Sequence, residues 1–107
     1  MQAIVKKEGM IKGIIGYKVL DYKSVEQILM QLKSAAMQYP GYVDAEFLVS
    51  EGDQSIGLMI STWETMENWR TWVESKGTEA LLRRARTAVM GSARLSAYKM
   101  MPTVEWR

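Results

Sequence analysis

The sequence contains no cysteine and no histidine among its 107 residues. Without cysteine the chain can form no disulfide, no thiolate nucleophile and no cysteine-based zinc site. Without histidine it lacks the usual general base near neutral pH and the commonest ligand of zinc and haem iron. A Ser-His-Asp triad is therefore excluded within this chain. The absence of cysteine is consistent with the cytoplasm, where we expect the protein to be located.

Excess charge and long apolar runs are also missing. The net charge is only +2, which is too small to indicate nucleic acid or an anionic membrane as a partner. The local cluster of Arg83, Arg84 and Arg86 is typical of a solvated helix face. No apolar run approaches the roughly 20 residues that a membrane-spanning helix needs. We expect a loosely ordered lead-in over residues 1–12, followed by a single domain over residues 13–107.

Glycine and proline divide the first part of the chain into a strand and a helix. Residues 13–22 are rich in β-branched and aromatic residues and predict a strand, in which Gly16 indicates a bulge or a close approach by another group. The helix should begin at Ser24, an N-cap with Gln27 three residues later, and end before Pro40. Its buried face follows helical spacing and comprises Val25, Ile28, Leu29, Leu32 and Ala36.

The next two segments, residues 42–50 and 55–63, predict the arms of a hairpin. The first arm separates Val43, Ala45, Phe47 and Val49 from Asp44, Glu46 and Leu48. The second arm is nearly apolar on both faces, with Ile56, Leu58 and Ile60 opposite Met59, Ser61 and Trp63. A strand that is apolar on both faces is covered on both sides. Helices can cover one face in so short a chain, so we expect a second copy of the chain to cover the other.

The remaining segments predict a helix in two pieces and a closing strand. Thr65 is a plausible N-cap, with Met66, Trp69 and Val73 on one helix face. Thr78 can cap a further helix that Gly91 would stop, and residues 93–101 read as a strand. The resulting order, strand-helix-strand-strand-helix-strand, predicts an α+β fold of the ferredoxin-like type, an antiparallel sheet with helices on one face.

Between residues 13 and 101 the chain resembles the antibiotic biosynthesis monooxygenase family, part of the dimeric α+β barrel superfamily. The resemblance is carried by "PGYVDAEFLVSEGD" and "LMISTWETMENWRTWVES". These supply a Pro-Gly-aromatic entry to the second strand, an apolar third strand ending in Trp-Glu, and an aromatic helix. The resemblance implies a homodimer closed into a barrel. It also implies a small aromatic ligand between sheet and helices, and oxygenation of phenols or quinols with no metal or flavin cofactor.

The resemblance also assigns roles to particular positions. Trp63 matches the tryptophan that lines the substrate cavity in active relatives. Leu82 occupies the position of the histidine ligand in the haem-degrading branch, and leucine cannot bind iron. The first strand also lacks the asparagine of that branch, so we do not expect haem degradation. Of the Trp, Asn, Tyr and Arg of the phenol-oxidising branch, only the Trp finds a match.

Six residues are candidates for a substrate pocket: Trp63, Met59, Trp72, Tyr17, Tyr98 and Arg86. The tryptophans would supply flat contacts and the methionine an adaptable wall, while the tyrosines and the arginine would hold a phenolate. For Trp63 and Trp72, core packing is an equal alternative, and Trp69 is expected to pack in the core. The sequence therefore leaves two functions open. One is a cofactor-independent monooxygenase. The other is a non-catalytic dimeric module that binds a small molecule or has a stress-related role.

Overall fold

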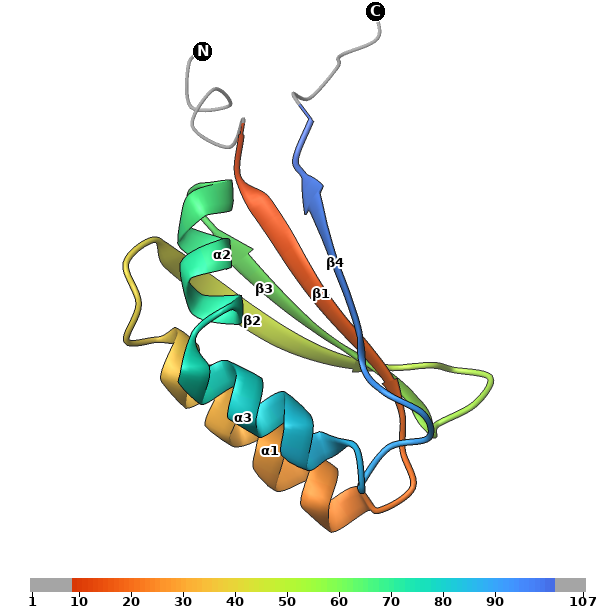
Figure 1. Ribbon diagram of the computed structural model, residues 1–107. Coiled ribbons are helices and arrows are strands. Elements are labelled where there is room, and N and C mark those ends of the chain that lie inside the picture. Colours follow the sequence, from red (N-terminus) through yellow and green to blue (C-terminus); the bar gives the residue numbers. More distant parts are fainter. Residues whose placement is uncertain (1–8, 102–107) are drawn as a thin grey trace, which may run out of the picture.

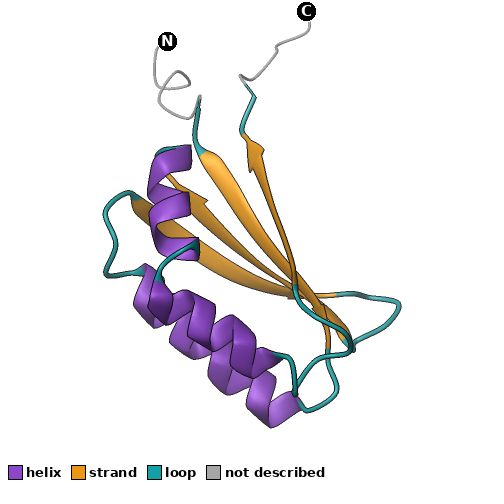
Figure 2. Cartoon of the chain, viewed as in Figure 1, coloured by secondary structure: helices purple, strands orange, loops and turns teal. Residues whose placement is uncertain are grey.

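The computed structural model describes residues 9–101. Its elements follow the predicted order: β1 (Ile11–Lys18), α1 (Tyr22–Ala36), β2 (Tyr42–Val49), β3 (Ile56–Trp63), α2 (Met66–Val73), α3 (Lys76–Ala85) and β4 (Arg94–Lys99). The four strands form one antiparallel sheet in the order β2-β3-β1-β4. All three helices lie on one face of this sheet (Figure 1, Figure 2). The α+β ferredoxin-like prediction is therefore confirmed. Most of the predicted lead-in lies outside the described residues, and β1 begins at Ile11.

Two predicted helix starts were wrong by one turn. Asp21, not Ser24, caps α1, because its carboxylate accepts hydrogen bonds from the Ser24 backbone N–H and the Ser24 hydroxyl. Ser75, not Thr78, caps α3 and accepts from the Thr78 backbone N–H at 3.2 Å. In both helices an earlier oxygen-bearing side chain satisfies the free N–H groups, so the helix gains a turn. The cap predicted at Thr65 is confirmed, with the Asn68 N–H donating to its hydroxyl oxygen at 3.0 Å.

The chain also leaves α3 earlier than the sequence indicates. The predicted stop at Gly91 lies six residues beyond the observed end at Ala85. Gly91 instead forms part of the connection to β4, with a φ of +69° that favours glycine. Just before it, Val89 forms an isolated antiparallel bridge to Val19, which ties this connection to the end of β1.

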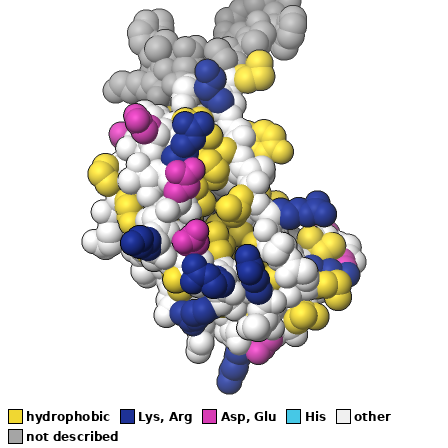
Figure 3. Space-filling model, in the orientation of Figure 1, with side chains coloured by type: hydrophobic (Ala, Val, Ile, Leu, Met, Phe, Trp, Pro, Cys, Tyr) yellow, Lys and Arg dark blue, Asp and Glu magenta, His cyan; other side chains and the backbone are white. Residues whose placement is uncertain are grey.

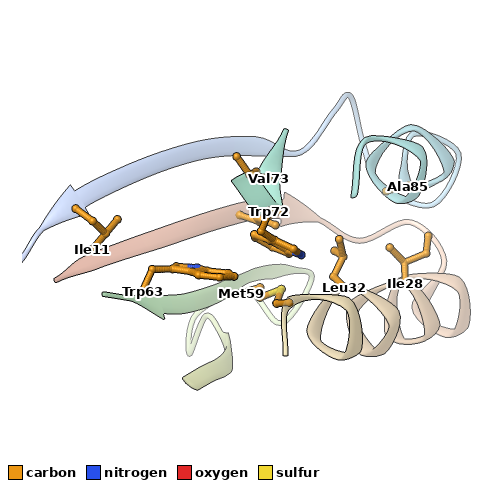
Figure 4. Close-up of a cluster of buried hydrophobic side chains, with 10 residues drawn as sticks. Ile11, Ile28, Leu32, Met59, Trp63, Trp72, Val73 and Ala85 are labelled. Atoms are coloured by element: carbon orange, nitrogen blue, oxygen red, sulfur yellow. The ribbon is translucent and has the colours of Figure 1, made fainter. Parts of the chain in front are cut away.

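The main core lies between the helices and the sheet (Figure 4). Trp63 from β3 and Trp72 from α2 are both fully buried and stack with ring centroids 5.4 Å apart. The Trp63 indole N–H donates to the buried Ser61 hydroxyl at 2.9 Å. Within the described residues, the buried Trp72 Nε1 has no hydrogen-bond partner. Trp69, as expected, packs against this core, and its indole lies over Gly13.

The sheet face opposite the helices is apolar at its centre. Ile14, Leu58 and Ile60 are half-buried there, and Ile56 is 42% exposed. These side chains share one face because antiparallel partners across a ladder point the same way. No element within residues 9–101 covers them. The two-sided apolar character expected for β3 is therefore present in the fold.

Candidate functional site

A cavity of about 470 Å³ lies between α1 and β2. Its walls are mainly apolar, with Leu29 and Met30 from α1 on one side and Phe47 and Val49 from β2 on the other. A cavity of this size falls in the range that holds drug-sized organic ligands. The cavity lies beside the first half of α1 and the end of β2, away from the connection that joins these two elements.

Tyr17 forms the floor of this cavity. It stands opposite Gly57 in the β1–β3 ladder. A Cβ atom on Gly57 would lie 2.6 Å from the Tyr17 hydroxyl oxygen, so the ring lies across the bare backbone of β3. Partial burial raises the pKa of the Tyr17 phenol above its ordinary value. Among residues 9–101 its hydroxyl makes no hydrogen bond with a protein group, so a protonated donor is available to a ligand.

Two other features define the mouth of the α1–β2 cavity. The Tyr22 hydroxyl donates to the Gln54 carbonyl oxygen at 2.8 Å, which ties the start of α1 to the β2–β3 hairpin. Lys23 and Glu26 lie at the rim, and both are exposed. Their opposite charges give the rim no clear preference for an anion. Tyr17 is therefore the floor residue that could donate a hydrogen bond to a polar or anionic ligand.

The six sequence-predicted site residues do not form one site. Tyr17 lines the α1–β2 cavity, whereas Met59, Trp63 and Trp72 are each 0% exposed and pack together in the core. None of these three lines the α1–β2 cavity. Tyr98 lies on the sheet face opposite the helices and is 61% exposed.

Arg86 lines a separate hollow of about 300 Å³ between α3 and β4. Arg83, Glu79 and Ser92 also line it, together with the apolar side chains of Leu82, Ala93 and Leu95. Figure 3 shows hydrophobic side chains in the gap between the helices and β4, with basic side chains beside them. The structure therefore separates Arg86 from Tyr17, two groups that the sequence suggested as holders of the same phenolate.

Sequence reasoning missed most of the cavity wall. Tyr22 and Met30 are large side chains that fall outside the buried stripe of α1, and they are 61% and 63% exposed. Phe47, 41% exposed, was placed on a strand face but not in a pocket. The available signal was the position of large apolar residues beside, rather than within, the predicted buried face of the helix.

Neither a metal-binding cluster nor a membrane-spanning helix is present in residues 9–101. No group of three or more acidic side chains there is placed to hold a metal ion. No helix in the same range has the length and apolar character of a membrane span.

The fold and the sequence both match known proteins. A model of the antibiotic biosynthesis monooxygenase family matches residues 22–84, which is more than half of the chain. A search of curated proteins gives no match. Among solved structures, SnoaB, a cofactor-independent oxygenase from Streptomyces nogalater, is 12% identical with a TM-score of 0.77. The alignment covers 90% of this chain and 97% of SnoaB.

Two further solved structures have the same fold. Protein SO0527 from Shewanella oneidensis is 9% identical with a TM-score of 0.76, over 90% of this chain and 95% of that one. PA3566 from Pseudomonas aeruginosa is 11% identical with a TM-score of 0.70, over 89% and 97%. At these identities the structures establish the fold, and the family match establishes the relationship. The chain belongs to the antibiotic biosynthesis monooxygenase family.

Proposed function

We propose that the protein is a cofactor-independent monooxygenase that oxidises an aromatic, quinol-like small molecule in the α1–β2 cavity. The observation that carries this proposal is the half-buried Tyr17 hydroxyl, free of protein partners among the described residues, on the floor of an apolar cavity of about 470 Å³. Membership of the family supports the reaction class. The identity of the substrate rests on the shape and chemistry of the cavity.

The walls suit a flat, apolar body. Leu29 and Met30 would contact one face of the ring system, and Phe47 would contact the other. Tyr17 would donate a hydrogen bond to the substrate oxygen, and this bond would favour the ionised form of the substrate. A tyrosine phenol is protonated at neutral pH, and burial raises the pKa of Tyr17 further, so it can act as this donor. The apolar walls would exclude water from the reacting carbon.

The reaction needs an electron-rich substrate, since the electrons for oxygen reduction come from the substrate itself. A phenolate or its carbanion form transfers an electron to dioxygen, which gives a substrate radical and superoxide. These two radicals then combine at the substrate carbon. For an anthrone-type CH₂ group, one oxygen atom becomes the new carbonyl and the other leaves as water. Both CH₂ hydrogens depart in that water, so one dioxygen is consumed for each product formed. The protein would bind, orient and shield the substrate.

A non-catalytic binding module is the second candidate. It is favoured by the small number of polar groups at the cavity, where Tyr17 is the sole floor residue with a free hydroxyl among residues 9–101. Oxygen uptake with a panel of quinols and anthrones, measured beside a binding titration, separates the two functions. Turnover supports the monooxygenase. Saturable binding without oxygen uptake by any member of the panel would support the binding module instead.

We also propose that the protein is a homodimer in the cytoplasm, formed through the open sheet face. Ile14, Leu58 and Ile60 form an apolar centre on that face. The charges around it are separated by strand, with Glu46 on β2 and Arg94 on β4, the two edge strands. A two-fold contact that lays β2 over the partner's β4 would bring these opposite charges together. Burial of the apolar centre would supply the main driving force.

A further inference from the structure

A second, much smaller void lies behind Tyr17, between the helices and the sheet. Its volume is about 20 Å³, and no polar surface faces it. Ile28 and Leu32 of α1, Ala85 of α3 and Ala93 before β4 are among its walls. A void of this size is large enough for one small molecule. A water molecule would find no hydrogen-bond partner there, so the void should stay dry.

This small apolar void is itself partly open, and it lies between the two larger hollows. It shares Tyr17, Val25 and Leu29 with the α1–β2 cavity. It shares Leu82 and Ala93 with the α3–β4 hollow of about 300 Å³. The helix–sheet layer is therefore hollowed at three successive places, and the ring of Tyr17 is the wall between the first and second. A substrate that filled the α1–β2 cavity would close that entrance to a second reactant, whereas the α3–β4 side would stay open.

We propose that this small apolar void binds dioxygen and that dioxygen enters it from the α3–β4 hollow. Dioxygen is small and apolar, so it partitions from water into a dry apolar space, as other apolar guests do. The site holds it on the opposite side of Tyr17 from the substrate, so dioxygen would have to pass the boundary formed by Tyr17, Val25 and Leu29 to react. The role of this site in catalysis rests on the proposed monooxygenase function, but binding of the gas does not.

Dioxygen itself is the probe for binding, because it is paramagnetic and broadens nearby methyl signals. Methyl-labelled protein is compared under oxygen and under nitrogen at equal pressure. We expect broadening at Ile28 and Ala85 that is at least about threefold greater than at Ile11 and Ala88. Ile11 and Ile28 are 4% and 5% exposed, so they are matched in burial, but Ile11 and Ala88 do not line the void. Equal broadening at all four methyl groups would overturn the proposal.

Variants that fill the void provide the second arm. Ala85→Leu and Ala93→Val should abolish the excess broadening at Ile28, whereas Ala80→Leu, on the exposed face of α3, should preserve it. If Ala85→Leu does not fold, Ala93→Val at its half-buried position carries the same test. Retention of the excess broadening in a folded filling variant would contradict the assignment of the site.

Kinetics separates failure of this site from failure of the proposed function. In an active enzyme, Ala93→Val should raise the KM for dioxygen about threefold and leave the KM for the aromatic substrate unchanged. Turnover with an unchanged KM for dioxygen would contradict a role for the void in catalysis but would support the proposed monooxygenase function. Localised broadening in a protein that consumes no oxygen would support the dioxygen site and contradict the proposed monooxygenase function.

Discussion

The phenol ring of Tyr17 lies over Gly57, and a Cβ atom at Gly57 would stand 2.6 Å from the Tyr17 hydroxyl oxygen and 2.7 Å from two ring carbons. Side-chain atoms cannot approach so closely, so any larger residue at position 57 would displace the ring. Gly57 therefore provides the space that sets the orientation of the one tyrosine on the cavity floor.

Gly57→Ala is expected to weaken binding of a naphthol probe by about tenfold, because the displaced ring would both enter the cavity and misdirect its hydroxyl. Calorimetric titration measures the change. Gly52→Ala is the matched control, since Gly52 lies in the hairpin turn, where an added Cβ atom would meet no other atom within 4 Å. Equal affinity in the Gly57 and Gly52 variants would show that the Tyr17 orientation does not matter for binding.

The two stacked tryptophans offer a paired stability test. Trp63→Phe removes the hydrogen bond from Nε1 to the buried Ser61 hydroxyl, whereas Trp72→Phe removes an N–H that has no partner within the described residues. We expect Trp63→Phe to lower the free energy of unfolding by about 1 kcal/mol more than Trp72→Phe. Urea denaturation measures both values. The expectation fails if Trp72→Phe proves the more destabilising of the two.

The sequence predicted the architecture because the signals for it are local. Strand alternation, helical spacing and the hairpin turn at residues 51–54 depend on neighbours in the chain, and they reappear in the fold except at Val43, where an irregularity in β2 interrupts the alternation. The helix starts were less secure, because Asp21 and Ser24, or Ser75 and Thr78, offer equally good cap chemistry three residues apart.

The cavity was harder to predict because its walls come from distant segments. The place of Tyr17 depends on Gly57, forty residues away, and on how far α1 stands from β2. The same holds for Trp63, whose resemblance to a pocket tryptophan gives no information about the stacking of Trp72 against it. Residue type alone could not decide between pocket wall and core for these rings.

Tyrosine burial predicts a loss of stability at high pH. Burial raises the folded-state pKa of Tyr17 above 10.0, the value expected in the unfolded chain. Below that pH both states hold the proton and pH has no effect through this group. Above it the unfolded chain loses the proton first, so the free energy of unfolding falls until the folded pKa is reached.

Tyr17→Phe should therefore show a shallower loss of stability than the unmodified protein as the pH rises above about 10. Urea denaturation at several pH values measures the slope. Burial, followed by the charge of Asp44, also raises the pKa of Tyr42, so some pH dependence should persist in the variant. Identical slopes with and without Tyr17 would mean that its phenol is not protected from ionisation.

The proposed dimer makes its own prediction. Ile60→Glu places a charge at the apolar centre of the open sheet face and should convert a dimer into a monomer at micromolar concentration. Sedimentation velocity distinguishes the two states. Ala80→Glu, on the exposed side of α3, should leave the dimer intact. A well-folded monomer for the unmodified protein at the same concentration would rule out this use of the face.

The most direct measurement of the central claim is oxygen consumption by the purified protein with quinols and anthrones, compared with that of Tyr17→Phe. We predict turnover by the unmodified protein and a loss of about tenfold or more in kcat/KM for Tyr17→Phe, because the phenol stabilises the ionised substrate. Trp63→Phe, a core substitution outside the cavity, should retain most of its activity while folded. The opposite pattern, with activity kept in Tyr17→Phe and lost in folded Trp63→Phe, would contradict the placement of the reaction in the α1–β2 cavity.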